Sequence, residues 1–400
     1  MTTARRSWDV DDHSTLRAVA ALDELVLRNV AEGIRSRRLA PEVHTALRSA
    51  GVYRMLVPRC AGGEEVSYPL ALRVTERLAR VDGSVAWCAI IGAASNAFGV
   101  ALPPGVAEAT LWRDPDVGAA AVFMPNGRAT PTDGGYRVSG RWPFASGCTD
   151  AAWFAGQCRV EVNGTPDGAA SPPTHRMAVM PLRELWIDAT WHATGLRATG
   201  SHDVEADDVF VPAERLFELG KADPSRQGPL SRYPFLALLT SSLAAVSVGL
   251  ARSATDALGT ALARRAERLE RGADALLGSA VLELALLEAA ERSARTAFFA
   301  SVDALWDAVD AVVAGDDALE ALSIDVQLAS RHAVANAVDV ATRAHRLGGA
   351  AALHEEHPLQ RAARDAQAVA QHGLFGLAPH ESLGRTLVTR RMAPRDTVDT

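Results

Sequence analysis

The segment Gly140-Arg-Trp-Pro-Phe-Ala-Ser-Gly147 is the most informative stretch of this 400-residue sequence. Glycines bound it, and it places two aromatic residues, Trp142 and Phe144, next to the hydroxyl of Ser146. A flat apolar cover beside a group that both donates and accepts hydrogen bonds suits a planar heteroaromatic cofactor. The alternative is a loop at the end of a strand, with its tryptophan in the core and its serine bonded to the backbone.

The sequence around this segment falls into three zones. Residues 1–117 show helical spacing of apolar side chains, whereas residues 118–220 contain short strand-like stretches and the turn dipeptides Asp133-Gly134 and Asn163-Gly164. Residues 221–400 return to helix, with predicted helices at 234–272, 275–313, 317–347 and 358–371. Helices, then strands, then helices is not the alternating pattern of a doubly wound sheet, so we predict a mainly α fold with a β insert.

Composition narrows the class of protein further. A hydrophobic content of 48% and a charged content of 22% are typical of a globular chain, and a net charge of −7 gives no reason to expect nucleic acid. The N-terminus lacks an apolar signal core, and hydroxyl residues interrupt the apolar run from Phe235 to Leu250. The four cysteines show no paired spacing. We predict a cytoplasmic protein with reduced thiols and no membrane span.

Two kinds of ligand site are not expected from the sequence motifs. No Gly-x-Gly-x-x-Gly follows a strand-like stretch and no phosphate-binding loop motif occurs, so a built-in dinucleotide fold is not predicted. The stretch His354-Glu-Glu-His357 lacks the four-residue histidine spacing of a zinc helix and has no evident third ligand. We therefore predict no metal site.

Taken in order, several segments resemble the acyl-CoA dehydrogenase superfamily. The closer resemblance is to its two-component flavin-dependent monooxygenases, a group that includes aromatic hydroxylases, dibenzothiophene monooxygenase and amino-sugar N-oxygenases. The segments are Leu39-Ala-Pro-Glu-Val43, Gly51–Pro58, Asp82–Trp87, Gly140–Gly147, Pro212–Leu216 and Leu347–Gly373. The resemblance covers about residues 15–390. It implies an N-terminal helical domain (1–117), a β-barrel-like middle domain (118–220) and a C-terminal four-helix bundle (221–400). It also implies a homotetramer, a dimer of dimers, in which a neighbouring subunit completes part of each flavin site.

The resemblance assigns flavin contacts to particular residues. Trp142 and Phe144 would cover the ring, and Ala145, Ser146 and Gly147 would lie along its edge, with Ser146 against N5 and O4. Further contacts are implied at Gly348 and Gly349, where a backbone without side chains can approach the flavin of a neighbouring subunit. Arg271, in a cluster with Arg264, Arg265 and Arg268, would contact a flavin phosphate. A solvated helix face is the other explanation of that cluster.

His372, in the turn Gln371-His372-Gly373, separates two activities. In acyl-CoA dehydrogenases the matching turn often carries a glutamate that removes a carbon-bound proton. The other place where such a base is found reads here Leu239-Thr-Ser-Ser-Leu243, which contains no carboxylate. A neutral histidine suits donation to a flavin peroxide oxygen, or deprotonation of a phenol, amine or hydroxyl. The alternative is a histidine stabilised at a helix end by the helix dipole, an effect of ~1 kcal/mol or less.

The helix after Asp82 departs from the pattern of several relatives, which carry a further active-site histidine there. The stretch from Ile90 to Gly99 contains none. Ser95 or Asn96 can stand in as a polar group that faces the substrate, and we take Asn96 as the catalytic candidate. An equally good account makes both of them polar core residues at a kink.

We therefore predict a flavin-dependent monooxygenase that receives reduced FAD or FMN from a separate NAD(P)H:flavin reductase. Molecular oxygen is the co-substrate: it forms a C4a-hydroperoxide in a pocket that excludes water, and one oxygen passes to carbon, nitrogen or sulfur of a small organic substrate, such as a secondary metabolite. Two alternatives stay open. One is an acyl-CoA dehydrogenase or oxidase with an unusual base, and the other is a non-redox descendant of the fold that binds no flavin.

Overall fold

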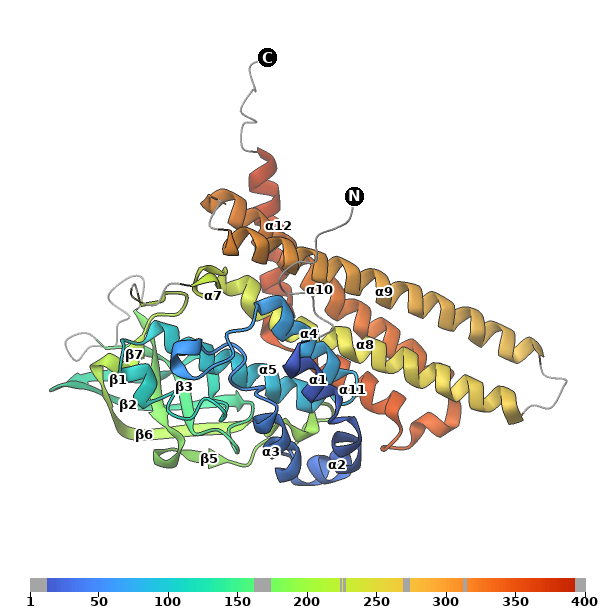
Figure 1. The fold of residues 1–400 in the computed structure, drawn as a ribbon, viewed down its shortest axis with the longest axis horizontal. Helices are drawn as coiled ribbons and strands as arrows, with labels where there is room; N and C mark the ends of the chain where they lie inside the picture. The colour runs from blue at the N-terminus through green and yellow to red at the C-terminus, as the bar shows by residue number, and fades with distance from the viewer. Residues whose placement is uncertain are drawn as a thin grey trace, which may run out of the picture.

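The computed structural model describes residues 13–161, 174–223, 225, 228–268, 274–311 and 315–392. Figure 1 shows the β domain, formed by the middle of the chain, at one end of the molecule and the long C-terminal helices at the other. The N-terminal helices lie between them. The chain therefore has the order helices, sheet, helices that its sequence predicts.

The N-terminal part begins its helices with recognisable caps. Ser67 and Asp82 accept hydrogen bonds from the backbone N–H groups of Leu70 and Val85, and Pro41 occupies the first turn of its helix. The helices are α1 (Ser14–Ala20), α2 (Asp23–Ser36), α3 (Pro41–Ser49), α4 (Tyr68–Ala79), α5 (Gly83–Ala97) and α6 (Val106–Ala109), with short 3₁₀ helices η2 (Arg59–Ala61) and η3 (Phe98–Ala101).

The β domain is one seven-stranded sheet with the strand order β5-β6-β2-β1-β3-β4-β7. Its strands are β1 (Ala120–Thr132), β2 (Gly135–Ala145), β3 (Trp153–Val160), β4 (His175–Pro181), β5 (Trp186–Asp188), β6 (His202–Pro212) and β7 (Leu216–Phe217), with 3₁₀ helices η4 (Leu182–Glu184), η5 (Arg197–Thr199) and η6 (Ala213–Arg215). The predicted turn at Asp133-Gly134 joins β1 to β2, and Gly134 has the left-handed φ of 76° that such a turn requires. The second turn dipeptide, Asn163-Gly164, lies outside the described residues.

Trp142 fills the core of the β domain, and glycines on neighbouring strands make room for it. A Cβ at Gly127 would lie 2.2 Å from the indole, and one at Gly156 would lie 2.7 Å from it. The indole N–H donates to the carbonyl of Gln157 at 2.8 Å, and the ring meets Phe154 edge-on with centroids 5.4 Å apart. Absent side chains on β1 and β3 thus determine where the largest side chain of β2 goes.

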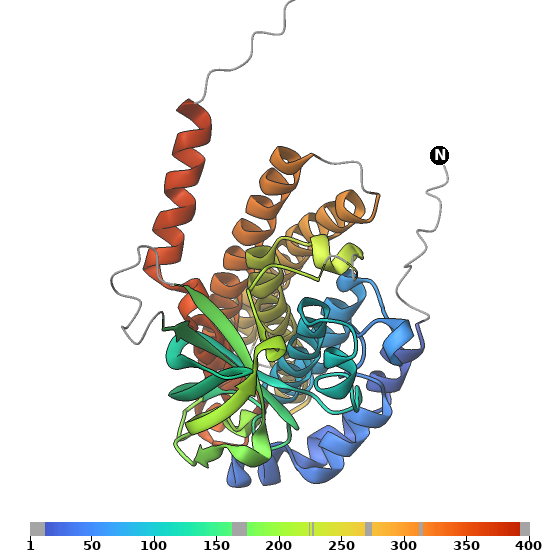
Figure 2. The same cartoon turned by 90° about the vertical axis from the view of Figure 1, so that its left-hand side faces the viewer.

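The C-terminal part is built from long helices that correspond to the four predicted from the sequence, with one short helix before them and another helix after them. They are α7 (Pro229–Arg232), α8 (Phe235–Arg268), α9 (Asp274–Asp310), α10 (Asp316–Leu347), α11 (Pro358–Ala370) and α12 (Leu377–Met392), with 3₁₀ helices η7 (Gly349–Leu353) and η8 (Gly373–Phe375). Figure 2 shows α12 extending away from the rest of the molecule.

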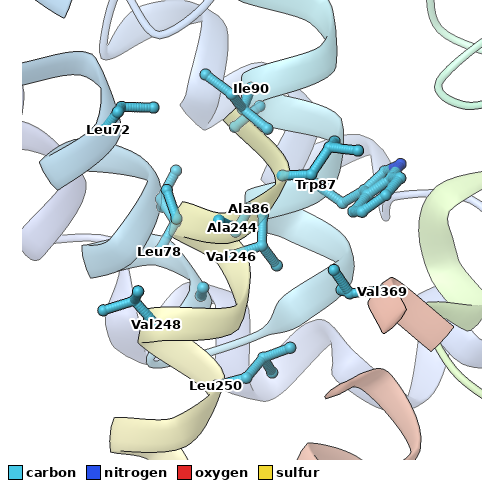
Figure 3. Packing of buried hydrophobic residues seen from close by; sticks show 14 of the residues in the cluster. Leu72, Leu78, Ala86, Trp87, Ile90, Ala244, Val246, Val248, Leu250 and Val369 are labelled. Carbon is cyan, nitrogen blue, oxygen red and sulfur yellow. The ribbon is translucent and has the colours of Figure 1, made fainter. Parts of the chain in front are cut away.

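Helix α5 lies at the centre of the molecule and is buried along almost its whole length. Side chains of α4, α8 and α11 pack around it, and Figure 3 shows Trp87 on the side of α5 that faces away from Leu72 and Leu78. The segments Gly83–Ala101 and Phe235–Glu267 are long and apolar enough to cross a membrane, but 72% and 78% of their most apolar windows are buried inside the protein. Such burial is typical of core helices, so these two segments are weak evidence for a membrane span.

Replacing Gly127 with alanine tests the packing around Trp142. The new Cβ would lie 2.2 Å from the indole and 2.6 Å from Cys158 Sγ, so we expect Gly127→Ala to lower the free energy of unfolding by about 2 kcal/mol. Chemical denaturation measures the change. The matched control is Gly278→Ala, whose Cβ meets nothing within 4 Å and which should stabilise α9 by up to about 1 kcal/mol. Equal stability of the two variants would contradict this account of the core.

Candidate functional site

The end of β2 is shaped by a β-bulge. In the pairing of β2 with β6, Trp142 lies opposite Val204 and Ala145 opposite His202, so two residues of β2 face one of β6. Phe144, one of these two, has a φ of 64°, a conformation that non-glycine residues adopt rarely. The bulge leaves the Phe144 side chain 69% exposed.

The position of Trp142 corrects one prediction from the sequence. We predicted that Trp142 covers a flavin ring, but its side chain is fully buried inside the β domain with its N–H already bonded, so it cannot cover a ligand. Phe144 is the aromatic residue that the structure leaves available, and its ring stands edge-on to Trp191 with centroids 6.4 Å apart. Ala145 is buried, whereas a Cβ at Gly147, with a φ of 74°, would meet nothing within 4 Å.

Ser146 belongs to a chain of side-chain hydrogen bonds that joins three parts of the molecule. The indole N–H of Trp87, on α5, donates to Ser146 Oγ at 2.9 Å. Ser146 Oγ lies 2.7 Å from Ser201 Oγ, which lies 2.6 Å from Thr199 Oγ1. Thr199 Oγ1 in turn donates to the carbonyl of Leu196 at 2.9 Å. The hydroxyl predicted to face the cofactor is therefore held in place from both sides.

His372 lies beside this chain. Its ring centroid is 6.0 Å from that of Trp87, so α5 brings the two residues singled out in the sequence, Ser146 and His372, to the same indole. His372 Nδ1 accepts a hydrogen bond from the backbone N–H of Leu374 at 3.3 Å, at the start of η8. The residue keeps an exposed surface, yet surrounding protein desolvates the imidazole and lowers its pKa from 6.5 to about 4. His372 is therefore neutral at physiological pH.

Asp365, two turns before His372 on α11, fixes this helix against α5. Its carboxylate accepts the backbone N–H of Leu196 at 2.7 Å, and a Cβ at Gly83 would lie 2.8 Å from its Oδ2, so only glycine fits there. Burial and the nearby Asp82 raise the pKa of Asp365 to about 7, against the opposing effects of the Leu196 N–H and Arg361. The Asp365 carboxylate is thus bonded to the Leu196 backbone and packed against Gly83 at the start of α5, while the imidazole of His372 lies beside Trp87, one turn further along α5.

Asn96 is enclosed in the helical core. Its side-chain amide nitrogen donates to the carbonyls of Tyr53, Pro115 and Val117 at 3.2, 3.4 and 3.0 Å, and its backbone carbonyl accepts the indole N–H of Trp112 at 2.8 Å. These contacts fit the second of our two interpretations, a polar core residue at the end of α5. The catalytic role of Asn96 stays a prediction that its contacts do not favour.

Two further predicted cofactor residues, Gly348 and Gly349, do not meet Ser146 within one chain. Gly348 packs under Leu359, near the start of α11, where a Cβ would lie 2.6 Å from the leucine side chain, and Gly349 has open space and a φ of 65°. Because α11 has 13 residues and is about 20 Å long, these glycines lie a helix length away from His372. Arg271 lies outside the described residues.

A small cavity adjoins Ser146 on the side of the N-terminal helices. It has a volume of about 20 Å³, and its walls include His44, Tyr53, Cys88 and Asp150 as well as Ser146. Burial lowers the pKa of His44, although Asp150 opposes the effect. A space of this size holds about one water molecule, so it is no substrate pocket.

These residues fit a flavin. The end of β2 offers an exposed aromatic ring, a hydroxyl held in one position and an open glycine, and a neutral imidazole lies nearby. Such a set can flank a planar ring, bond its polar edge and donate a proton. We find no group of three or more potential metal ligands among the described residues.

Comparison with known proteins gives the family to which the chain belongs. Residues 241–376 match the family described as acyl-CoA dehydrogenase, C-terminal domain. The chain is 33% identical to indole-3-acetate monooxygenase of Pseudomonas putida over 362 residues, 90% of each protein. It is 29% identical to the oxygenase component of the FADH2-dependent resorcinol hydroxylase of Rhizobium sp. strain MTP-10005 over 377 residues, 88% of each. The crystal structure of 3-HSA hydroxylase from Rhodococcus sp. RHA1 superimposes with a TM-score of 0.86 at 25% identity, covering 97% of this chain and 98% of that one.

Fold and site together define a flavin enzyme of the acyl-CoA dehydrogenase type. More narrowly, the chain belongs to the two-component flavin-dependent monooxygenases, as an oxygenase component that uses a reduced flavin. This confirms the predicted family and class of reaction. The alternatives of an acyl-CoA dehydrogenase with an unusual base and of a non-redox scaffold find no support in the whole-chain relatives.

Sequence reasoning missed three residues of the site, Trp87, Thr199 and Ser201. Trp87 belongs to a segment that carries the family resemblance, but nothing in its spacing shows that its N–H reaches Ser146, 59 residues away. Thr199 and Ser201 lie in a stretch that carries no motif. Because a buried hydroxyl group needs a hydrogen-bond partner, a buried Ser146 indicates that such partners exist, but the sequence does not show that they are Thr199 and Ser201.

The pKa of His372 can be measured directly by NMR titration of labelled histidine, with His372→Gln to assign the signal. We expect a value near 4 and no titration between pH 5 and pH 8. Because this pKa lies below the unfolded value of 6.5, the unfolded chain binds the proton first. His372 should therefore lower the stability of the fold as pH falls from 6.5 towards 4, and have no effect above that window. A titration near 6.5 would contradict the desolvated site.

Proposed function

We propose that this enzyme oxygenates a small aromatic substrate, with reduced FAD or FMN supplied by a separate NAD(P)H:flavin reductase. The observation that carries the proposal is the neutral imidazole of His372 beside the Trp87–Ser146 pair. The names of two relatives, indole-3-acetate monooxygenase and resorcinol hydroxylase, support the aromatic class of substrate. Electron-rich carbon is the favoured site of attack, with nitrogen and sulfur as the alternatives.

Ser146 and Phe144 would hold the flavin at the end of β2. The backbone N–H groups of Ser146 and Gly147 are already bonded to the carbonyls of Phe144 and Thr199, at 2.9 and 2.8 Å. The Ser146 hydroxyl is therefore the polar group left to meet the cofactor edge, and the Phe144 ring is the exposed apolar surface next to it. When bound, the reduced flavin supplies the electrons that activate molecular oxygen.

His372 holds a proton at a defined atom. Because Nδ1 accepts the N–H of Leu374, the neutral ring carries its hydrogen on Nε2. Nε2–H can donate to an oxygen atom of a bound ligand, and Nε2 keeps its hydrogen because the ring as a whole stays neutral down to about pH 4. A carboxylate at the same place would accept a proton instead, which suits the removal of a carbon-bound hydrogen.

The assembly and compartment are part of the proposal. We propose a homotetramer, in which a neighbouring subunit brings residues such as Gly348 and Gly349 to each site. Helix α12 extends from the rest of the molecule and exposes Leu377, Val388 and Met392, which supports burial of this helix by another copy.

A cytoplasmic location is supported by cysteines that stay free, three of them buried.

Replacement of His372 tests the proposal. With indole-3-acetate and resorcinol as probes and photoreduced FAD or FMN, we expect His372→Ala to slow hydroxylation by at least about 100-fold. The dissociation constant of the reduced flavin, measured anaerobically, should change by less than about threefold, because His372 is not needed to hold the flavin.

His372→Gln is the matched variant, since its amide can still donate a hydrogen bond, and it should retain more hydroxylation than His372→Ala. If alanine weakens flavin binding as much as it slows hydroxylation, His372 has a structural role only. Failure of a wider panel of phenols and aromatic acids to give any product would contradict the aromatic class.

A further inference from the structure

We propose that Trp87, Thr199 and Ser201 fix the direction of the Ser146 hydroxyl proton, and that Ser146 thereby favours reduced over oxidised flavin. The inference rests on the proposed place of Ser146 at the N5 edge of the flavin. It adds three positioning residues, and it assigns the selection between the two redox states to a hydrogen-bond chain inside the protein.

The hydrogen-bond chain has a fixed donor at one end and a fixed acceptor at the other. The indole N–H of Trp87 can only donate, and the carbonyl of Leu196 can only accept. Between these ends lie three hydroxyl groups, each with one proton, in contacts of 2.9, 2.7, 2.6 and 2.9 Å. Four contacts thus share four protons, one from the indole and three from the hydroxyls.

One arrangement satisfies every contact. Thr199 donates to the Leu196 carbonyl, so it must accept from Ser201. The Ser201 proton is then used, so Ser201 must accept from Ser146. Ser146 accepts from Trp87 and donates to Ser201, which leaves its oxygen one free lone pair and no free proton. Reversal of any one hydroxyl would leave two oxygens facing each other without a hydrogen between them.

Burial makes this arrangement firm. Trp87, Ser146, Thr199 and Ser201 are all less than 9% exposed, so water has little access to replace a lost partner. An unpaired polar group in such a place is unfavourable, and hydrogen bonds in a chain strengthen one another. The Ser146 hydroxyl therefore meets a ligand as an acceptor.

The two redox states of flavin differ at the atom concerned. N5 of reduced flavin carries a hydrogen and donates, whereas N5 of oxidised flavin has a lone pair and accepts. An acceptor-only Ser146 complements the first state and opposes the second. Two-component chemistry needs this preference, because the enzyme must take up the reduced form and release the oxidised form.

Two variants of Ser201 test the inference. Ser201→Ala removes the group that takes the Ser146 proton, so Ser146 becomes free to donate to oxidised N5. We expect the ratio of the dissociation constants for oxidised and reduced flavin to fall by up to about tenfold. Ser201→Thr keeps the hydroxyl and should keep the wild-type ratio within about twofold. Anaerobic titrations with FMN and FAD give both constants, and the midpoint potential of the bound flavin must shift by the corresponding amount.

Further variants separate the possible failures. Thr199→Val removes the acceptor for the Ser201 proton and should lower the ratio in the same direction, which covers the case that Ser201→Ala does not fold. An unchanged ratio in Ser201→Ala, together with a changed ratio in Ser146→Ala, would overturn the inference but leave the proposed flavin site intact. No effect of Ser146→Ala on either redox state would overturn both. Equal changes in Ser201→Ala and Ser201→Thr would reduce Ser201 to a packing role.

Discussion

The hydrogen bond from Trp87 to Ser146 is the contact on which the site depends. Helix α5 is buried between α4, α8 and α11, so the position of Trp87 is set by the helical core and not by the sheet. Ser146 follows the end of β2, whose position is set by the sheet. The 2.9 Å hydrogen bond from Trp87 to Ser146 joins the helical core to the sheet at one point. The place where a ligand meets the β domain is therefore fixed relative to the helices that carry the imidazole.

Helix α11 completes the site because it lies along α5 in a fixed register. Asp365 meets the start of α5 and the Leu196 backbone, and His372 meets Trp87 one turn further along α5. This register decides which ionisable groups lie beside Ser146. It places a neutral donor beside Ser146 and commits the buried carboxylate of α11 to a backbone N–H, so the acid is occupied in holding the helices together.

The sequence predicted the order of the three parts, the long C-terminal helices and the importance of Ser146 and His372, since each depends on local patterns or on a resemblance of whole segments. The sequence failed to predict the direction of a side chain and the contacts between residues that lie far apart along the chain. Trp142 lies in the core because glycines on β1 and β3 leave space for its indole, and the bulge after it turns Phe144 outward; no spacing rule shows either feature. Trp87 and Ser201 reach Ser146 across 59 and 55 residues, so only the folded chain shows these contacts.

The bulge that turns Phe144 outward also explains why the candidate site lies at the end of β2. A regular strand would keep its alternation to the last residue and place Phe144 on the same buried face as Trp142. The extra residue instead forces Phe144 into a left-handed conformation with its ring exposed, while Trp142 stays buried and Ser146 turns towards Trp87. Such strain persists only where neighbouring contacts hold it. On one side of Phe144, the space between the glycines of β1 and β3 holds Trp142. On the other side, the hydrogen-bond chain of hydroxyl groups holds Ser146. The core of the β domain and the candidate site therefore stabilise the same strained residue.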